Sequence, residues 1–255
     1  MEIKEIAKQL KTVSDTPVLD ARLLVQSPGN LQEKIDRRLK HEPVSKIIGQ
    51  KGFWKSDFVT SQDVLDPRPD SETLIEAVLK SCPDINRSYR ILDIGVGSGC
   101  LLFSLLDEYP NATGVGVDIS EKALAISRQN KKDRKATLIQ KDFYQTDWAT
   151  DLGLFDIVIS NPPYIPTKDI EKLEPDVRLY DPITALDGGR DGLNAYRALA
   201  KSIPALLNKN GLVFLEIGQG QEKDVTDIFL ATGFTLCHTV SDFGGIVRVL
   251  VFQKS

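Results

Sequence analysis

The chain has 255 residues, of which 41% are hydrophobic and 27% charged, and its formal net charge is -4. These values are ordinary for a globular protein and exclude a fibrous or largely disordered chain. The acidic balance is the opposite of that in a domain that holds nucleic acid mainly through its phosphates. The length exceeds one average domain and predicts one main domain with a smaller attachment.

The cysteines and histidines are few and scattered. Cys82, Cys100 and Cys237 form no CxxC pair, and the only histidines are His41 and His238. This spacing supports neither a zinc site nor a disulfide framework. The first residues, MEIKEIAKQLK, mix charged and single apolar side chains and lack the apolar run of a signal peptide or a membrane helix. We therefore expect a cytoplasmic protein that binds no metal.

Apolar residues recur at helical spacing over residues 3–40, and proline and glycine divide this region into three pieces. The pattern predicts a small helical domain over residues 1–46. Residues 47–60 are instead rich in β-branched and aromatic side chains, which is typical of a β-hairpin. We expect this hairpin to lie within a linker that spans residues 47–69.

From residue 70 onward the pattern changes to helices that alternate with short apolar strands, as in a mostly parallel sheet. Asp70 or Ser71 is expected to cap the first of these helices. The last long helix should bend at Pro204, because a proline ring does not fit the helix interior. Strands are expected at residues 90–94, 113–118, 136–140, 154–160 and 211–217, and helices at about 100–108, 120–131, 192–208 and 221–231.

The chain closes with two strand-like segments, FTLCHTV and IVRVLVF, joined by a turn at residues 241–245. They predict an antiparallel hairpin at one edge of the sheet. Residues 70–255 are therefore expected to form one α/β domain. Within it, residues 165–191 are long for a connection without secondary structure, which indicates a lid or a binding loop.

A glycine-rich loop follows the first strand of this domain. Residues 91–99 read ILDIGVGSG and lead directly into an apolar helix. Glycine is needed where the backbone turns sharply and a ligand approaches too closely for a Cβ, and the start of the helix offers free amide hydrogens. The next strand ends at Asp118, near the position expected for an acid that accepts ribose hydroxyls. The loop is therefore predicted to bind a ligand that contains adenosine.

Two ligand classes fit such a loop, a dinucleotide and S-adenosylmethionine. The spacing is GxGxG and not the GxGxxG of dinucleotide sites, and Asp93 ends the strand where it could face a cationic amino-acid group. These features favour S-adenosylmethionine. Asp142 and Phe143 follow the third strand and are candidates to contact the adenine amine and the adenine ring. The predicted cofactor contacts are Asp93, Gly95, Val96, Gly97, Ser98, Gly99, Asp118, Asp142, Phe143 and Asn161.

The fourth strand, LFDIVIS, is apolar almost throughout and ends at Asn161-Pro162-Pro163-Tyr164, where ligands of open α/β sheets bind. The nitrogen of an amide or of an exocyclic ring amine is a poor nucleophile, because its lone pair is delocalised. The side-chain oxygen of Asn161 and the carbonyl of Pro162 are predicted to accept its two N–H bonds, which orients the nitrogen and stabilises developing positive charge. Tyr164 is expected to wall the planar acceptor, and no strong general base is required.

Beyond these motifs, the chain resembles the protein-glutamine methyltransferase family that modifies bacterial peptide chain release factors, from about residue 41 to its end. The resemblance implies a Rossmann-like class I S-adenosylmethionine-dependent methyltransferase fold, with a mostly parallel seven-stranded sheet. It also implies a helical N-terminal domain that helps to dock the factor. Four further stretches carry it: EPVSKIIGQKGFW (42–54), VLDPRPDSETL (64–74), EPDVRLYDPITALDGGRDGLNAYRAL (174–199) and LVFLEIGQGQ (212–221).

In this family the acceptor is the glutamine of the Gly-Gly-Gln loop of class 1 release factors, and the products are N5-methylglutamine and S-adenosylhomocysteine. The resemblance implies that Asn161-Pro162-Pro163-Tyr164 forms the glutamine site, and that Arg68, Pro69 and Glu72 border the same cleft. One departure from the family pattern is Asp66, which stands where an apolar residue is usual.

Other functions are compatible with parts of this pattern. An N6-adenine or other nucleic-acid amino-methyltransferase would use the same Asn-Pro-Pro-Tyr site on a base flipped from its stack, although the acidic charge and the lack of a target-reading domain argue against it. A binding protein that keeps the fold without turnover and a dinucleotide dehydrogenase are further alternatives, since fold alone does not determine function. We expect a monomer whose partner is a release factor, with no nucleic acid and no membrane.

Overall fold

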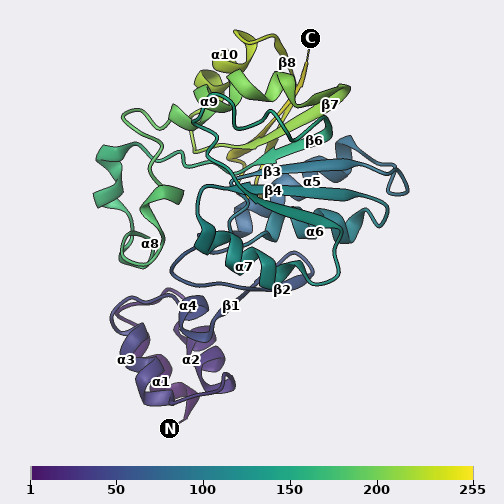
Figure 1. Cartoon of the computed structure of the whole chain (residues 1–255). Coiled ribbons are helices and arrows are strands. Elements are labelled where there is room, and N and C mark those ends of the chain that lie inside the picture. Colours follow the sequence, from purple (N-terminus) through teal and green to yellow (C-terminus); the bar gives the residue numbers. More distant parts are fainter. Residues whose placement is uncertain (1, 255) are drawn as a thin grey trace.

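The computed structural model describes residues 2–254. Its N-terminal part consists of four short helices at one end of the molecule (Figure 1), which share a hydrophobic core of their own. The three helices predicted over residues 3–40 are confirmed. A fourth helix ends at Ile48 and so crosses the predicted boundary at residue 46. The helices are α1 (Ile3–Leu10), α2 (Pro17–Gln26), α3 (Leu31–Arg38) and α4 (Val44–Ile48).

The predicted β-hairpin is also confirmed. Strands β1 (Gln50–Phe53) and β2 (Ser56–Val59) pair antiparallel and follow the N-terminal helices. Phe53 and Phe58 are buried in the same core as the helices that cover the main sheet. The hairpin is therefore anchored to the main body by its aromatic side chains.

Seven strands form the main sheet, in the order β5-β4-β3-β6-β7-β9-β8. The first five in this order run parallel, whereas β9 pairs antiparallel with both β7 and β8. The C-terminal hairpin thus forms one edge of the sheet, as predicted, and the predicted strands are confirmed, except that β7 begins earlier than expected. The strands are β3 (Arg90–Ile94), β4 (Thr113–Asp118), β5 (Ala136–Gln140), β6 (Phe155–Ser160), β7 (Leu207–Glu216), β8 (Phe234–Ser241) and β9 (Val247–Lys254).

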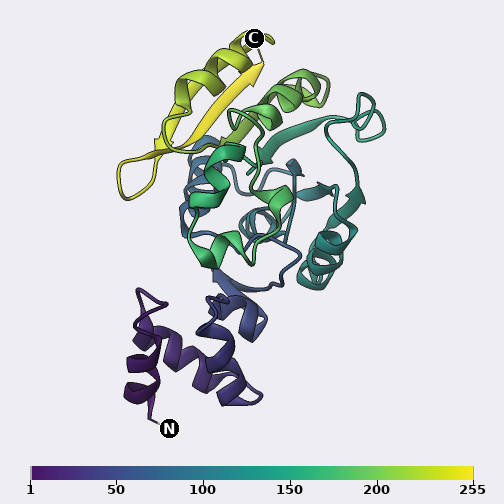
Figure 2. The ribbon, with the colours of Figure 1, turned by 90° about the vertical axis from the view of Figure 1, so that its left-hand side faces the viewer.

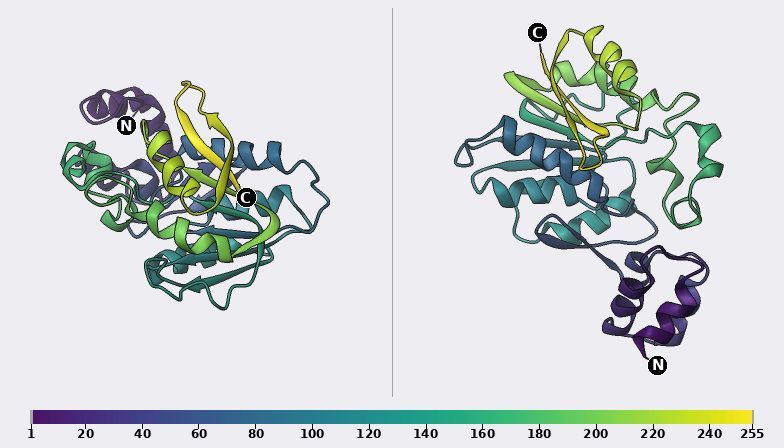
Figure 3. Two further views of the ribbon diagram at one scale, coloured as in Figure 1. Left: turned by 90° about the horizontal axis from the view of Figure 1, so that it is seen from above. Right: turned by 180° about the vertical axis from the view of Figure 1, so that it is seen from behind.

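Helices cover both faces of this sheet, and Figure 3 gives two further views of the arrangement. Helices α5, α6 and α7 contribute to the core on one face and α9 and α10 to the core on the other. Ile91 and Leu92 enter different cores because successive residues of a strand point to opposite faces. No helix within residues 2–254 has both the length and the apolar character needed to cross a membrane. The helices are α5 (Glu72–Ser81), α6 (Cys100–Glu108), α7 (Glu121–Lys131), α9 (Asn194–Ser202) and α10 (Glu222–Leu230).

Two local predictions in this region are wrong. The expected helix over residues 192–208 does not bend at Pro204 but ends at Ser202, and a 3-10 turn, η4 (Ile203–Ala205), leads directly into β7. The proline ring stops the helix because it removes a backbone donor. Ser71 does occupy the N-cap position of α5, but its side chain makes no capping hydrogen bond. Its hydroxyl instead contacts Asn161, far along the chain.

Residues 165–191 form an ordered excursion, called the lid segment below, and not a structureless loop. It contains two 3-10 helices, η2 (Thr167–Lys172) and η3 (Ile183–Ala185), and the single-turn helix α8 (Pro175–Arg178). Backbone hydrogen bonds close its base, from the amide of Ile165 to Leu186 and from the amide of Gly188 back to Ile165. In Figure 2 the lid segment lies in front of the main body, on the side that faces the viewer.

Candidate functional site

The two motifs predicted from the sequence meet at the carboxyl edge of the sheet. The glycine-rich loop follows β3 and the Asn-Pro-Pro-Tyr motif follows β6, and these two strands are neighbours. From β3 the chain crosses to β4 on one side, whereas from β6 it crosses to β7 on the other side. The crevice between β3 and β6 is therefore a topological switch point, the place where open α/β sheets bind their ligands.

The glycine-rich loop has a backbone that only glycine adopts without strain. The φ angles of Gly95, Gly97 and Gly99 are 82°, 53° and 83°, all in the left-handed region. A Cβ on Gly99 would also lie 2.2 Å from the ring of Phe103 on α6. The glycines thus allow the loop to turn and the first turn of α6 to pack against it, which leaves the free amides of the helix start near the crevice.

Asp118, at the end of β4, is tied to this loop. One oxygen of its carboxylate accepts a hydrogen bond from the amide of Gly97 at 2.9 Å, and the other accepts one from the amide of Ser120 at 2.9 Å. Burial raises the pKa of Asp118, and these backbone hydrogen bonds oppose the rise. Each carboxylate oxygen keeps a further lone pair for a donor in the crevice, such as a ribose hydroxyl.

Asp93 on β3 is a buried acid without a partner. Its exposed fraction is 1%, and neither carboxylate oxygen accepts a hydrogen bond from residues 2–254. Burial, together with the nearby charge of Asp118, raises the pKa of Asp93 to about 8. A nearby cation favours the ionised form of such a group. S-adenosylmethionine carries an ammonium and a sulfonium, and the free lone pairs of Asp118 suit its ribose, so the residues present fit this cofactor. Asp93 and Gly99 are not among the residues that line the cavity described below.

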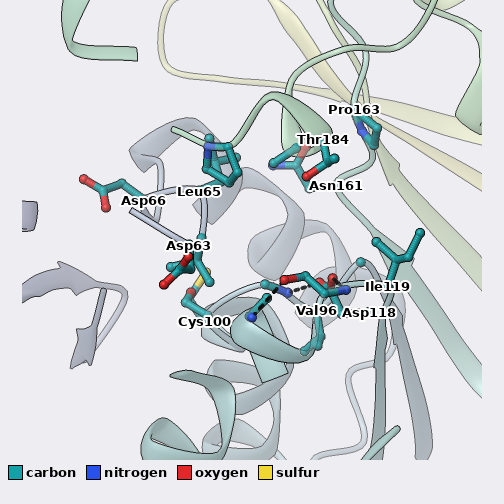
Figure 4. Close-up of a pocket in the computed structure, with 18 of the residues that line it drawn as sticks. Asp63, Leu65, Asp66, Val96, Cys100, Asp118, Ile119, Asn161, Pro163 and Thr184 are labelled. Atoms are coloured by element: carbon teal, nitrogen blue, oxygen red, sulfur yellow. Dashed lines mark hydrogen bonds between the residues drawn. The ribbon is translucent and has the colours of Figure 1, made fainter. Parts of the chain in front are cut away.

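A cavity of about 380 Å³ opens between the loop, the motif and the lid segment. Figure 4 shows Asn161, Pro163 and Thr184 close together on one side of it and Asp118 and Val96 on another, with the two hydrogen bonds of Asp118 dashed. The structure therefore brings most of the predicted contacts around one space. The predicted site residues that line it are Arg68, Gly95, Val96, Gly97, Ser98, Asp118, Asp142, Phe143, Asn161 and Pro163.

The Asn-Pro-Pro-Tyr motif divides between the cavity and the protein interior. Asn161 lines the cavity, and its Nδ2 donates a hydrogen bond to Ser71 Oγ at 3.1 Å, which leaves Oδ1 available to a ligand. Pro162 and Tyr164 are not among the lining residues. The Tyr164 hydroxyl is instead close to the buried carboxyl of Glu216 at the end of β7, and burial raises the pKa of this tyrosine. In this structure Tyr164 therefore does not wall the cavity.

The three residues expected at the border of the cleft differ in position. Arg68 lines the cavity and pairs with Asp181 of the lid segment. Pro69 begins the 3-10 turn η1 (Pro69–Ser71) and is not a lining residue. Glu72 is turned away, because its carboxylate accepts a hydrogen bond from the backbone amide of Trp54 at 2.8 Å. Glu72 is the first residue of α5 and is not a lining residue of the cavity.

Several lining residues were not predicted from the sequence. Most come from the segment before α5 and from the lid segment, and others, such as Cys100, Ile119 and Tyr144, follow β3, β4 and β5. No local pattern marks them, because their role depends on contacts between distant parts of the chain. They include Asp63, Val64, Leu65, Ser71, Pro182, Ile183, Thr184, Ala185 and Asp187.

A buried ion cluster, formed by Lys46, Asp66, Arg68 and Asp181, fixes the lid segment to the rest of the protein. The side chain of Lys46 is 2% exposed, and its Nζ lies 3.1 Å from Asp66 and 2.9 Å from Asp181. Arg68 pairs with the other oxygen of Asp181. Asp66, the acidic residue that departs from the family pattern, is thus paired with the buried cation of Lys46. Asp181 directly precedes the lid residues that line the cavity.

Comparisons with known proteins agree with this architecture. The profile of the family "Methyltransferase small domain" matches residues 51–174. The chain is 41% identical to the release factor glutamine methyltransferase of Caulobacter vibrioides over 94% of this chain and 91% of that protein. It is 44% identical to the protein of the same name from Rhodospirillum rubrum over 88% of this chain and 68% of that protein. The solved structure of a methyltransferase from Pyrococcus furiosus, 18% identical, superposes with a TM-score of 0.60 over 88% of this chain and 99% of that one, which shows a shared fold.

The seven-stranded sheet, the glycine-rich loop with its acid and the motif after β6 define a class I S-adenosylmethionine-dependent methyltransferase, and S-adenosylmethionine is its cofactor. Similarity to the curated relatives extends over almost the whole chain. This chain belongs to the release factor glutamine methyltransferase family. The family resemblance inferred from the sequence is thereby confirmed.

Proposed function

We propose that this chain transfers a methyl group from S-adenosylmethionine to the side-chain amide nitrogen of a glutamine in a peptide chain release factor. The products are N5-methylglutamine and S-adenosylhomocysteine. The observation that carries the proposal is the position of Asn161, which lines the cofactor cavity at the end of β6 with its Nδ2 already bonded to Ser71. The names of the relatives and the sequence resemblance indicate the Gly-Gly-Gln loop of class 1 factors as the acceptor.

The residues of the motif act by binding and orienting the acceptor. When bound, the cofactor supplies an electrophilic methyl group on a positively charged sulfur. The free Oδ1 of Asn161 accepts one N–H bond of the acceptor amide. The carbonyl of Pro162, which does not line the cavity in this structure, is the second acceptor that the motif predicts. Both oxygens stabilise positive charge as it develops on the nitrogen, in the manner of an oxyanion hole with the sign reversed. Fixed alignment of this kind can contribute about 7 to 11 kcal/mol to lowering a barrier.

A second cavity, of about 690 Å³, supports docking of a protein acceptor near the N-terminal helices. It is lined by residues of α2, including Leu19 and Leu23, and by Asp176 and Val177 of the lid segment. The lid segment and the N-terminal helices are also in direct contact, since Arg38 pairs with Asp176 at 2.9 Å. We propose that the release factor enters between these parts. The same proposal includes that the protein is a monomer, acts in the cytoplasm and has neither a nucleic-acid nor a membrane partner.

The proposal is tested by label transfer from methyl-labelled S-adenosylmethionine to a purified release factor. Asn161→Ala should lower kcat by about 100- to 1,000-fold, the range seen when one group that stabilises developing charge is removed. Asn111→Ala is the matched control, because Asn111 lies outside the lining of the cofactor cavity and donates only to a backbone oxygen on the surface.

Mass spectrometry of the labelled factor should find the methyl group on the loop glutamine. Equal labelling of a factor with that glutamine changed to alanine would reject the acceptor. Labelling of DNA in place of the factor would favour the amino-methyltransferase alternative, because the same oxygens suit the exocyclic amine of adenine.

A further inference from the structure

The orientation of the Asn161 side chain decides whether the site can bind an NH2 group. The two ends of a carboxamide are nearly identical in shape, but one accepts hydrogen bonds and the other donates them. If the amide were flipped, its NH2 group would face the NH2 group of the acceptor and repel it. Within residues 2–254, the hydrogen bond found for this side chain is the one from Nδ2 to Ser71 Oγ. Ser71 is therefore the group that distinguishes the two orientations.

Ser71 is suited to this task only if its own proton points elsewhere. Its hydroxyl has one proton and two lone pairs, and the residue is 3% exposed, so water does not compete freely for it. When Ser71 Oγ accepts from Asn161, its proton needs another acceptor. The carboxyl of Glu216, at the end of β7, lies beside Ser71 and is 2% exposed, and its Oε2 has no hydrogen-bond partner within residues 2–254. An ionised carboxylate can only accept a hydrogen bond. The Ser71 proton therefore points at Glu216, and Ser71 Oγ accepts from Asn161 Nδ2.

The surroundings of Glu216 leave it close to its ionisation point. Burial raises the pKa of Glu216 to about 7, while the hydrogen bond from Ser71 and the charge of Arg248 oppose the rise. The other groups that face it are Asp70, the hydroxyl of Tyr164 and the thiol of Cys100 at the start of α6. From α9, Tyr196 donates its hydroxyl to the backbone oxygen of Glu216 at 2.8 Å. Arg248 is shared with Asp70, which it contacts at 2.7 Å, and with Asp242 at 2.8 Å.

We propose that Ser71 and Glu216 are positioning residues that hold Asn161 with Oδ1 toward the acceptor, through hydrogen bonds that run from Asn161 to Ser71 to Glu216. When Glu216 gains a proton, it can donate to Ser71, and the Ser71 proton is then free to point at Asn161. This reversal favours the flipped amide. The inference rests on the proposed function only in that the acceptor carries an NH2 group.

The first test compares Ser71→Ala with Ser104→Ala at saturating cofactor, with the release factor as acceptor. Ser104 is a matched control, because it is 1% exposed and its hydroxyl has no hydrogen-bond partner within residues 2–254. Ser71→Ala should lower kcat by at least about tenfold, the effect of one buried hydrogen bond of about 1.4 kcal/mol. The Kd for S-adenosylmethionine should stay within about twofold of wild type, which also shows that the variant is folded.

Combined variants separate a positioning role from a general structural one. If Ser71 acts through Asn161, Ser71→Ala should cause no further loss of kcat in an Asn161→Ala background. The kcat of the wild type should fall as the pH is lowered through about 7, and Glu216→Gln should remove this dependence. Unchanged activity of Ser71→Ala, additive losses in the double variant, or an acid limb that persists in Glu216→Gln would each overturn the proposal.

A spectroscopic test does not depend on any acceptor. The side-chain amide resonance of Asn161 in an ¹⁵N-labelled sample is assigned by its loss in Asn161→Ala. In the wild type this resonance should shift as the pH is lowered through about 7, and Ser71→Ala and Glu216→Gln should both abolish the shift. If the pH-dependent shift of this resonance is the same in both variants as in the wild type, the positioning role is rejected, even if release-factor methylation is observed. The expected shifts in a protein that methylates no release factor would reject the proposed acceptor alone.

Discussion

The buried ion cluster offers a sharp test of how the lid segment is held. Lys46→Met keeps the length of the side chain and removes its charge. In the protein, Lys46 Nζ lies within 3.1 Å of Asp66 and 2.9 Å of Asp181, and it also donates to the backbone oxygens of Ser61 and Val64 at 2.7 and 2.6 Å. The substitution leaves two buried carboxylates without this cation and two carbonyls without a donor.

Removal of one partner of a buried ion pair costs about 3–5 kcal/mol. The lower end applies here, because Asp181 retains Arg68 and Asp66 retains the hydroxyls of Ser45 and Thr60. For a chain of this size each kcal/mol lowers Tm by about 2–4 °C. We therefore expect Lys46→Met to lower Tm by roughly 6–12 °C.

Differential scanning calorimetry near neutral pH measures this shift. Lys223→Met is the control, because Lys223 forms an ion pair with Asp227 on the surface, where its side chain is 85% exposed. An exposed pair one helical turn apart contributes about 0.3–0.5 kcal/mol, so its Tm should change by about 2 °C at most. The double variant Lys46→Met with Asp66→Leu should recover part of the loss, because apolar groups can replace a buried pair. A Tm for Lys46→Met equal to that of Lys223→Met would refute this reasoning.

Two further predictions concern the cofactor loop. The pKa of Asp93 is raised to about 8 in the folded protein, whereas an unfolded aspartate titrates near 3.9. Between these values the folded state binds more protons, so its stability falls as pH rises. Tm should therefore drop between about pH 4 and about pH 8, and Asp93→Asn should reduce the drop. Gly99→Ala puts a Cβ 2.2 Å from Phe103 at a φ of +83°, so it should lower Tm by several degrees and weaken cofactor binding by at least about tenfold in calorimetric titration, and normal values for both would contradict the role given to this glycine.

Features that depend on neighbouring residues could be predicted from the sequence. The strands of the main sheet, the glycine-rich loop and the C-terminal hairpin follow from apolar periodicity and turn residues, which act over a few positions. The prediction at Pro204 was wrong only in detail. The proline was expected to bend the helix, and in the structure the helix ends just before it, at Ser202. Asp118 was found because the length of one strand-helix-strand unit sets its distance from the loop.

Features that depend on contacts between distant segments required the tertiary structure. Ser71 looks like a helix cap, yet its hydroxyl serves Asn161, which is 90 residues away in the chain. Tyr164 belongs to a motif that predicts a contact with the acceptor, but the turn after β6 brings its hydroxyl near Glu216. Glu72 lies in a stretch that resembles the family, and a place at the cleft was expected for it. Its carboxylate instead accepts a hydrogen bond from the backbone amide of Trp54.

The class of fold, the cofactor loop and the place of the Asn-Pro-Pro-Tyr motif at the end of a strand could be predicted without a structure, because glycine and proline restrict the backbone wherever they occur. Which side chains complete the cavity became clear from the folded chain: the lid segment, the buried ion cluster that holds it and the hydrogen bond from Asn161 to Ser71. These contacts depend on burial, because a buried charge or hydroxyl without a partner is costly in free energy. The partner comes from a segment that is distant in the sequence and close in the fold.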